Sequence, residues 1–223
     1  AYRATSPVNW CPSCNTVLAN EQVVDGKCWR CGNVPEKREL SQWYLRITDY
    51  AQELLDDLDA LTGWPENVKA QQRNWIGRSE GAEIDFALAD ADGVTPTDRL
   101  VTVFTTRPDT LYGTTFFLLP PESPLAAELV AGTGYEEAYL ALRKSVEQVS
   151  SVDRQGSDRE KHGVFTGRYV INPLTHEALP IWVADYILLD YGTGAVMGVP
   201  SGDQRDFDFA RKYGLDIPPI IAQ

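Results

Sequence analysis

The spacing of hydrophobic residues changes along the chain, and each change predicts a different element. Between 51 and 61, alanine and leucine residues recur every three or four positions, which predicts an amphipathic helix that ends at Gly63. We expect Thr48 to cap the start of this helix. Pro65 suits the first position of a second short helix, which we expect to end near Asn74.

The period becomes two from Ala82 onward, because apolar residues alternate with more polar ones as far as Leu88, and this alternation predicts a strand. Further strands are expected over 100–105, 164–165, 169–171, 179–184 and 186–189. Further helices are expected over 124–131, 135–149 and 203–213, and the polar segment 150–158 is expected to be mobile. Strands and helices do not alternate regularly, so the pattern favours an α+β fold over a doubly wound parallel sheet.

The composition supports a folded body without a membrane span. Hydrophobic residues make up 43 % of the 223 positions, which is enough for a buried core. No uncharged apolar run approaches the ~18 residues that a membrane span requires, so we expect no membrane partner and a cytoplasmic location. The sequence begins at Ala1 and contains a single methionine, Met197, so we expect it to be a piece of a longer protein.

Charge is distributed unevenly over the chain, whose formal net charge is −12. Residues 1–46 carry six basic and four acidic side chains, whereas the remainder carries 14 basic and 28 acidic ones. The acidity argues against a general nucleic-acid-binding protein, which usually presents a basic face. Any contact of the larger part with nucleic acid should therefore be local, in a pocket for a few nucleotides.

The four cysteines lie close to the start of the sequence, in two Cys-x-x-Cys pairs formed by Cys11, Cys14, Cys28 and Cys31. Zinc favours four tetrahedral thiolate ligands, and each pair can present two of them on a tight turn. Two disulfides are the alternative, which an intracellular location disfavours. We therefore expect a structural Zn²⁺, because four protein ligands leave no open position for a catalytic water.

Two further segments suggest a ligand site, and the first runs from Thr105 to Gly113 as TTRPDTLYG. Three threonine hydroxyls and Arg107 surround a Pro-Asp turn at the end of a predicted strand, which suits the rim of a site. The alternative is a capped turn, in which threonine and aspartate side chains bond their own backbone.

The second segment runs from Gly192 to Asp206 and is rich in glycine. Its glycines do not spell a dinucleotide-binding motif, because Gly198 comes one residue late, so we interpret them as allowing close approach of the backbone to a ligand. Asp203 and Asp206 fall on the first turn of the predicted helix and can face the same side. The alternative is that these acids only favour the positive end of the helix dipole.

Together these segments resemble the editing (connective-polypeptide) domain of bacterial leucyl-tRNA synthetases. Residues 105–113 resemble the threonine-rich motif of that family, and residues 192–206 resemble its aspartate-bearing motif. The stretches 73–81 and 11–32 are also typical of the leucyl enzymes. Isoleucyl and valyl enzymes usually carry histidine where this chain has Met197, which favours the leucyl family. The resemblance covers essentially the whole chain.

The resemblance implies a division into a zinc ribbon over 1–40, a helical linker over 41–75 and an editing domain over 76–223. The class I synthetase editing domain has a β-barrel-like mixed sheet core with surrounding helices. In the family this domain continues beyond Ile217, so we expect its closing elements to be missing. The sequence also lacks the His-x-Gly-His and Lys-Met-Ser-Lys signatures that carry ATP chemistry. ATP and the ligation of leucine to tRNA(Leu) therefore belong to an absent core.

The resemblance implies that the domain hydrolyses the ester of mischarged aminoacyl-tRNA(Leu). One methylene changes binding by only ~1–3 kcal/mol, so a synthetic site cannot by itself reject amino acids such as isoleucine or norvaline strongly. An editing site hydrolyses the wrong esters and excludes leucine. Its expected partners are the aminoacylated 3′ end of tRNA(Leu) and the rest of the parent synthetase, and we expect a monomer.

Site residues follow from the resemblance by position. Asp206 resembles the aspartate that binds the substrate ammonium group, and Thr110 resembles the threonine that excludes leucine. Thr105 and Thr106 are expected to bond the ester region and to hold water, with Arg107 supporting the transition state or the backbone. The side-chain and adenosine pockets are expected to be lined by Leu188, Tyr191, Met197 and Val199, with Asp203 as a supporting acid.

The sequence shows no nucleophile–base pair, because His162 and His176 fall in predicted surface turns and the cysteines are used for metal. Attack by positioned water is therefore expected. Many relatives carry histidine where this chain has Gly202, which weakens any role for histidine as the base. Two alternatives remain, a module that only binds tRNA or a partner, and a metal-dependent hydrolase that uses Asp203 and Asp206.

Overall fold

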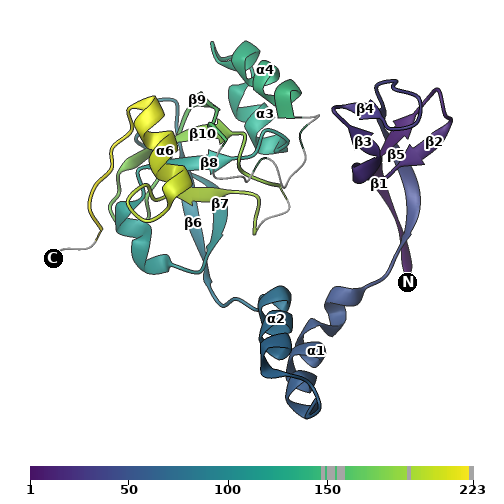
Figure 1. Ribbon diagram of the computed structural model, residues 1–223. Coiled ribbons are helices and arrows are strands. Elements are labelled where there is room, and N and C mark those ends of the chain that lie inside the picture. Colours follow the sequence, from purple (N-terminus) through teal and green to yellow (C-terminus); the bar gives the residue numbers. More distant parts are fainter. Residues whose placement is uncertain (147–148, 150–153, 155–158, 190–191, 221–223) are drawn as a thin grey trace. The chain divides into compact units, whose positions relative to one another are not determined.

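The computed structural model describes residues 1–146, 149, 154, 159–189 and 192–220 (Figure 1). The chain divides into two compact units, residues 1–78 and 79–223. The finer division of the first unit into a 1–40 ribbon and a 41–75 linker remains a prediction. The predicted mobile segment 150–158 lies, apart from Arg154, outside the described residues.

A three-stranded antiparallel sheet forms the core of the first unit. β1 (Tyr2–Cys11) pairs along its length with β5 (Glu36–Tyr44), and β2 (Thr16–Leu18) pairs with the other edge of β1. β3 (Val23–Val24) and β4 (Lys27–Cys28) form a short hairpin, which follows the 3₁₀ turn η1 (Asn20–Gln22).

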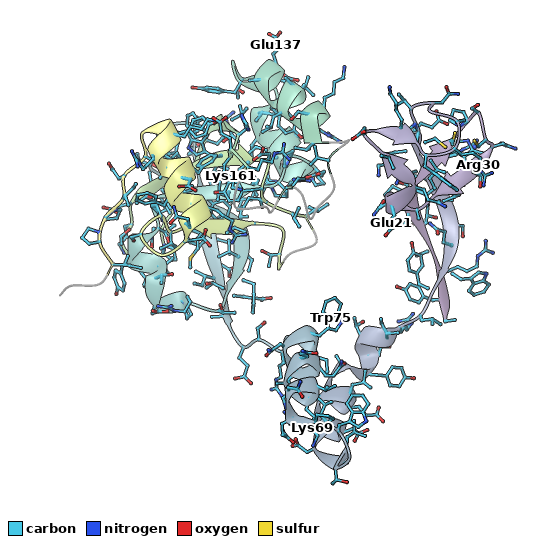
Figure 2. All side chains as sticks on the ribbon, viewed as in Figure 1. Glu21, Arg30, Lys69, Trp75, Glu137 and Lys161 are labelled. Atoms are coloured by element: carbon cyan, nitrogen blue, oxygen red, sulfur yellow. The ribbon has the colours of Figure 1, made fainter. Side chains whose placement is uncertain are left out.

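Two helices complete the first unit. They are α1 (Ala51–Asp57), between the 3₁₀ turns η2 (Ile47–Tyr50) and η3 (Leu58–Ala60), and α2 (Glu66–Ile76). Trp75, near the end of α2, is exposed (Figure 2).

The predicted boundaries of these helices need two corrections. Thr48 does not cap α1, because it lies within η2, which runs directly into the helix and makes Tyr50 the preceding residue. Pro65 stands one position before α2, in extended conformation, so the helix begins at Glu66. The helix closes at Gly77, whose φ of +62° suits glycine.

A six-stranded mixed sheet organises the second unit, with the strand order β11-β8-β10-β9-β6-β7. The strands are β6 (Ala82–Ala89), β7 (Pro96–Thr105), β8 (Phe116–Leu119), β9 (Gly163–Ile171), β10 (Ala178–Ala184) and β11 (Val196–Gly198). β8 and β10 run parallel, and the other described pairs are antiparallel. The predicted mixture of a mixed sheet with helices is confirmed. In the described residues the ladders leave β11 and β7 as edges, so closure into a barrel stays a prediction.

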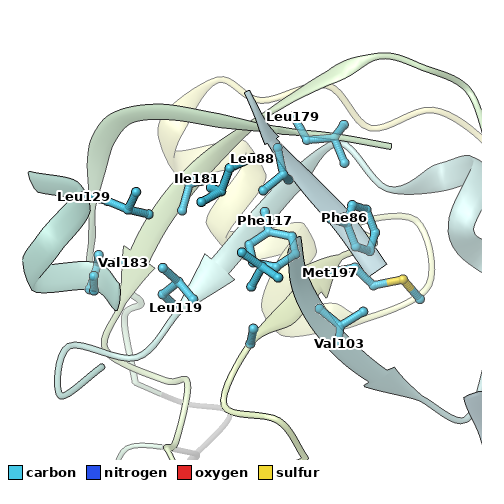
Figure 3. Packing of buried hydrophobic residues seen from close by; sticks show 14 of the residues in the cluster. Phe86, Leu88, Val103, Phe117, Leu119, Leu129, Leu179, Ile181, Val183 and Met197 are labelled. Carbon is cyan, nitrogen blue, oxygen red and sulfur yellow. The ribbon is translucent and has the colours of Figure 1, made fainter. Parts of the chain in front are cut away.

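Helices lie on both faces of this sheet, because successive side chains of a strand point to opposite faces and both faces carry apolar residues. In β8, Phe117 and Leu119 enter a large core that also receives α3 (Pro124–Val130) and α4 (Glu136–Val146) (Figure 3). Phe116 and Leu118 point to the opposite face and pack in a second cluster with α6 (Gln204–Tyr213). Short strand β8 is thus buried on both sides.

The predicted helix over 203–213 is confirmed as α6, with Asp203 as its N-cap and Gly214 closing it at φ +69°. The predicted strand over 186–189 is wrong. The chain turns at Asp185 and Tyr186, where the Ile187 N–H donates to the Ala184 carbonyl. In the described part of the chain, no helix combines the length and apolar character needed to cross a bilayer.

Candidate functional site

The four cysteines of the first unit lie together, with their Sγ atoms all within 4.8 Å of one another. The Sγ atoms of Cys11 and Cys31 are 3.4 Å apart, and those of Cys14 and Cys28 are 4.0 Å apart. The thiols are free, so the disulfide alternative is not what the structure shows. Tetrahedral bonds of ~2.3 Å place sulfur ligands roughly 3.8 Å apart, so the cluster fits a tetrahedral metal ion.

Local backbone geometry brings the thiols to this arrangement. The Cys14 N–H donates to the Cys11 Sγ at 3.4 Å, and the Gly32 N–H donates to the Cys28 carbonyl at 2.8 Å. A backbone hydrogen bond from Asn33 lowers the pKa of the Cys31 thiol to about 6. Hydrogen bonding to Cys31 raises the pKa of the Cys14 thiol to about 12. Cys31 therefore ionises readily, whereas Cys14 resists ionisation beside it. A bound cation would favour the thiolate form of both.

A cleft of about 650 Å³ opens in the second unit. Three segments line it. They are the end of β7 together with the 3₁₀ turn η4 (Pro108–Gly113) that follows it, the turn at 186–188, and the start of α6. Nine predicted site residues line it, namely Thr105, Thr106, Arg107, Thr110, Leu188, Met197, Val199, Asp203 and Asp206. The tenth, Tyr191, lies outside the described residues. Two motifs about ninety positions apart in the sequence thus meet at one cavity.

The threonine motif forms one wall of the cleft. The Thr105 Oγ1 accepts the Arg107 N–H at 3.0 Å, and the Thr110 Oγ1 donates to the Arg107 carbonyl at 2.8 Å. The exposed guanidinium of Arg107 pairs with the Asp109 carboxylate at 2.8 Å. The capped turn that was the alternative interpretation is therefore present as well, and it fixes the buried Thr110 side chain at the cleft.

Asp206 provides a buried carboxylate in the cleft, with only 6 % of its surface exposed. Its Oδ1 accepts the Tyr186 O–H at 2.9 Å, and its Oδ2 accepts the Val199 N–H at 2.9 Å. Burial raises the pKa of Asp206 to about 6, although the bond from Val199 opposes the rise. At neutral pH this carboxylate is therefore mostly ionised, and a cation in the cleft would favour its charged form.

Asp203 is held in a different way. Its Oδ1 accepts the Arg205 N–H at 2.8 Å and the Asp206 N–H at 3.3 Å, as expected for a helix N-cap. Its Oδ2 lies 3.0 Å from the Arg205 Nη2. Partial burial works against ionisation, but these bonds outweigh it and lower the pKa of Asp203. The interpretation of Asp203 as a helix-terminal acid thus holds, and its charge is balanced by Arg205.

The glycines of the segment 192–206 have different roles. Gly202 lines the cleft, whereas Gly198 serves packing, which corrects the predicted role of Gly198. A Cβ on Gly198 would lie 2.3 Å from the Phe116 ring, so glycine suits the position where β11 pairs with Phe116 of β8. Gly194 adopts φ +77°, a conformation that favours glycine. Met197, next to Gly198, belongs both to the large core and to the wall of the cleft (Figure 3).

Neither histidine lies at the cleft. His162 is half-exposed, with its Nδ1 3.5 Å from the Asp185 Oδ2, and His176 is exposed in a turn at φ +58°. Both therefore lie at the surface, as predicted. Among the described residues that line the cleft there is no histidine, cysteine or lysine, so the lining offers no conventional nucleophile–base pair.

The sequence interpretation gave no lining role to eight residues of the cleft, which are Phe104, Tyr186, Ile187, Val196, Ser201, Gly202, Arg205 and Ile220. Arg205 had a local signal, because it stands between the two aspartates of the motif. Tyr186 had none, because its apolar neighbours resemble a strand and its contact with Asp206 spans twenty positions.

Two family models match this chain. The leucyl-tRNA synthetase editing domain matches residues 73–223, and the class I tRNA synthetases for isoleucine, leucine, methionine and valine match residues 1–81. The chain is 57 % identical to the leucine–tRNA ligase of an Arthrobacter species and 58 % identical to that of Thermotoga maritima. Each comparison covers 99 % of this chain and 26 % of the relative, so the chain spans about a quarter of their length.

A solved structure shows the same relationship. It is the crystal structure of a LeuRS–tRNA–LeuAMS ternary complex from Agrobacterium radiobacter, at 45 % identity and a TM-score of 0.69. The match covers 97 % of this chain and 26 % of that one. Sequence relatives, family models and the fold agree, and the chain belongs to the leucyl-tRNA synthetase family, with the editing domain of that family over residues 73–223.

Proposed function

We propose that the cleft hydrolyses the ester of tRNA(Leu) charged with a wrong amino acid, such as isoleucine or norvaline, and excludes leucine. The observation that carries this proposal is the buried Asp206 carboxylate, which lines the same cleft as the threonine motif. An aminoacyl ester carries an α-ammonium group next to its carbonyl. A buried anion favours that cation because water competes poorly there.

The chemistry we propose is attack by water. Water adds to the ester carbonyl carbon, the bond from that carbon to the ribose oxygen breaks, and the ribose oxygen takes up the proton. The products are the free amino acid and the tRNA 3′ end. Thr105 and Thr106 supply hydroxyls that position the ester and the water, and Arg107 supports the developing charge or the loop. Positioning and fixed dipoles would supply most of the rate.

Selection against leucine would come from the walls of the cleft. Thr110 is a branched side chain held by its bond to the Arg107 carbonyl, so it resists displacement by a longer substrate. Leu188, Met197 and Val199 would contact the amino acid side chain or the adenosine. Tyr191 is proposed for the same lining from the family resemblance, and Asp203 would support the site through Arg205.

The first unit would hold a structural Zn²⁺ through Cys11, Cys14, Cys28 and Cys31, with no position left for a reactive water. Editing would need no other cofactor. The partners would be the aminoacylated 3′ end of tRNA(Leu) and the remainder of a monomeric cytoplasmic synthetase. ATP-dependent ligation of leucine would belong to that remainder.

The direct test is deacylation of tRNA(Leu) charged with isoleucine or norvaline by the 223-residue chain, with leucyl-tRNA(Leu) as the matched control. We expect hydrolysis of the first two and sparing of the third. Equal indifference to all three, with retained binding of tRNA, would favour the alternative of a pure binding module.

The other alternative, a metal-dependent hydrolase, finds less support. In the part of the chain that the structure describes, the cysteines are the only group of three or more potential metal ligands. Asp203 is already engaged by Arg205. Loss of deacylation in chelator and its recovery with Mg²⁺ or Mn²⁺ would nevertheless establish the metal-dependent mechanism.

A further inference from the structure

Asp206 is held in place by a chain of contacts that begins at a residue outside the lining of the cleft. The Tyr186 hydroxyl donates to the Asp206 Oδ1 at 2.9 Å, and both side chains are buried. Tyr186 stands in a turn, not in a strand, so its own backbone carbonyls and those of its neighbours are not fixed by a ladder.

Arg154 bonds two carbonyls of this turn, in addition to the packing of the Tyr186 ring against Phe209. Its Nε donates to the Asp185 carbonyl at 2.6 Å, and its Nη2 donates to the Ile187 carbonyl at 2.7 Å. One planar guanidinium thus holds the carbonyls on both sides of Tyr186. The Glu122 carboxylate pairs with the Nη1 of the same group, which balances its charge. Arg154 is only 6 % exposed and does not line the cleft.

We propose that Arg154 is a positioning residue of the editing site, which holds the turn around Tyr186 so that the Tyr186 hydroxyl orients the Asp206 carboxylate toward the substrate ammonium. The role rests on the proposed function of the cleft. A guanidinium is suited to it because its donors point in fixed directions within one plane, so it can hold two carbonyls at once.

The contact has an electrostatic consequence that makes it measurable. The groups that act on the Asp206 pKa are Tyr186 from the turn, the Val199 N–H from the segment after β11, and Asp203 and Arg205 from the start of α6. A hydrogen bond donated to a carboxylate favours its ionised form. Loss of the Tyr186 hydroxyl, or of its position, should therefore raise the pKa of Asp206 from its value of about 6.

The first measurement is the titration of the Asp206 side-chain carboxyl by ¹³C NMR, assigned by its disappearance in Asp206→Asn. We expect the midpoint to rise by about one pH unit in Tyr186→Phe, the size of a charge-assisted hydrogen bond. Arg154→Met should shift it in the same direction. Arg154→Lys should shift it less, because an ammonium keeps the charge beside Glu122 but cannot span both carbonyls.

A double variant tests whether Arg154 acts through Tyr186. In the Tyr186→Phe background, Arg154→Met should move the midpoint little further, because the contact that it supports is already gone. Tyr139→Phe is the control for a buried tyrosine hydroxyl, since Tyr139 is equally buried and donates to the Pro121 carbonyl instead. Arg159→Met is the control for charge, since Arg159 reaches the Asp185 carboxylate and not the flanking carbonyls. Neither control should move the midpoint.

The second measurement is deacylation of isoleucyl-tRNA(Leu) at two pH values. Near pH 6.5, a rise of one pH unit in the midpoint reduces the ionised fraction of Asp206 about threefold, so the KM of Tyr186→Phe should rise about threefold relative to wild type. Near pH 8.5, where Asp206 is ionised in both proteins, this ratio should fall to the smaller factor that lost orientation alone contributes. The substrate amine titrates alike with both proteins and cancels in the ratio.

The two measurements test different proposals. An inactive wild-type chain would overturn the proposed function, whereas the titration would still decide whether Arg154 and Tyr186 control Asp206. An unchanged Asp206 midpoint in Tyr186→Phe, or fully additive shifts in the double variant, would overturn the positioning role. A loss of activity that is equal at both pH values would likewise contradict it and indicate a purely structural defect.

Discussion

Arg205 forms its ion pair with Asp203, at 3.0 Å between Nη2 and Oδ2, and within the described residues no ion pair reaches Asp206. Two carboxylates three positions apart are thereby given different states. Asp203 has a lowered pKa and a balanced charge, whereas Asp206 has a raised pKa and faces the cleft. The relationship supports the proposal that Asp206, and not Asp203, binds the cation of the substrate.

Asp206→Asn should abolish deacylation and increase stability at alkaline pH. The folded pKa of about 6 lies above the ~3.9 of an unfolded aspartate, so the native state binds more protons between these values and loses stability as pH rises through them. The cost of ionisation is roughly 3 kcal/mol above pH 6. Asparagine removes it, since its carbonyl can accept from Val199 and its amide can donate to the Tyr186 hydroxyl.

Urea unfolding at pH 5 and pH 8 checks this prediction. The stability of Asp206→Asn relative to wild type should increase between the two pH values. Asp208→Asn, an exposed change on the same helix, should show no such dependence. A relative stability of Asp206→Asn that stays constant with pH would mean that the carboxylate is not destabilised by burial.

Asp203→Asn should leave the helix cap in place, because asparagine caps as well as aspartate does. It removes the partner of Arg205 and the repulsion that helps to raise the Asp206 pKa. Arg205 then becomes an unpaired cation beside Asp206 and competes with the substrate ammonium. We expect the KM for isoleucyl-tRNA(Leu) to rise up to about tenfold with little change in thermal stability. A KM equal to that of wild type would show that Arg205 does not reach Asp206.

Thr110→Ala should begin to hydrolyse leucyl-tRNA(Leu), because it removes the side chain proposed to block leucine. Thr110→Val is the matched variant, since it keeps the branched volume and loses only the hydroxyl. It should continue to spare leucine, apart from a cost of about 1 kcal/mol in stability for the lost bond to the Arg107 carbonyl. If both variants release leucine, the Thr110 hydroxyl and not its volume excludes leucine. If neither variant releases leucine, the steric role of Thr110 is refuted.

Metal removal should affect the two units differently. Purified chain should contain one zinc ion, and Cys31→Ser should lose it and lower the unfolding temperature of the first unit. Hydrolysis of a small aminoacyl ester by the second unit should persist, because its cleft contains no cysteine ligand. Elemental analysis together with calorimetry checks this, and full-strength metal binding by Cys31→Ser would refute the four-ligand site.

Gly198→Ala should destabilise the second unit by about 1–3 kcal/mol or more, because the added Cβ would meet the Phe116 ring at 2.3 Å. Gly134→Ala is the control, since a Cβ there has open space and no positive φ. Thermal melting distinguishes the two. A neutral Gly198→Ala would show that β11 can shift away from β8 without loss.

Most of the predicted residues line one cleft, and they could be found from the sequence because they fall in local motifs. The Asp203 cap, the first turn of α6 and the closing Gly214 are set by neighbours in sequence, so the element and its acids were found together. The turn at Tyr186 could not be found in this way. Its apolar run resembles a strand, and its conformation depends on Arg154, more than thirty positions away. The predicted helix starts at Thr48 and Pro65 were wrong for a smaller reason. A 3₁₀ turn precedes the first helix, and an extended proline precedes the second, so the first boundary lies a few positions later and the second one position later.

Met197 belongs at once to the wall of the cleft and to the main core of the second unit. A change of volume there alters substrate fit and packing together, so a variant with a new substrate range would start with a loss of stability. Thr110, in the turn η4, also lines the cleft and is buried, but it does not belong to that core cluster, which η4 enters through Leu111. New specificities should therefore arise more readily at Thr110 than at Met197.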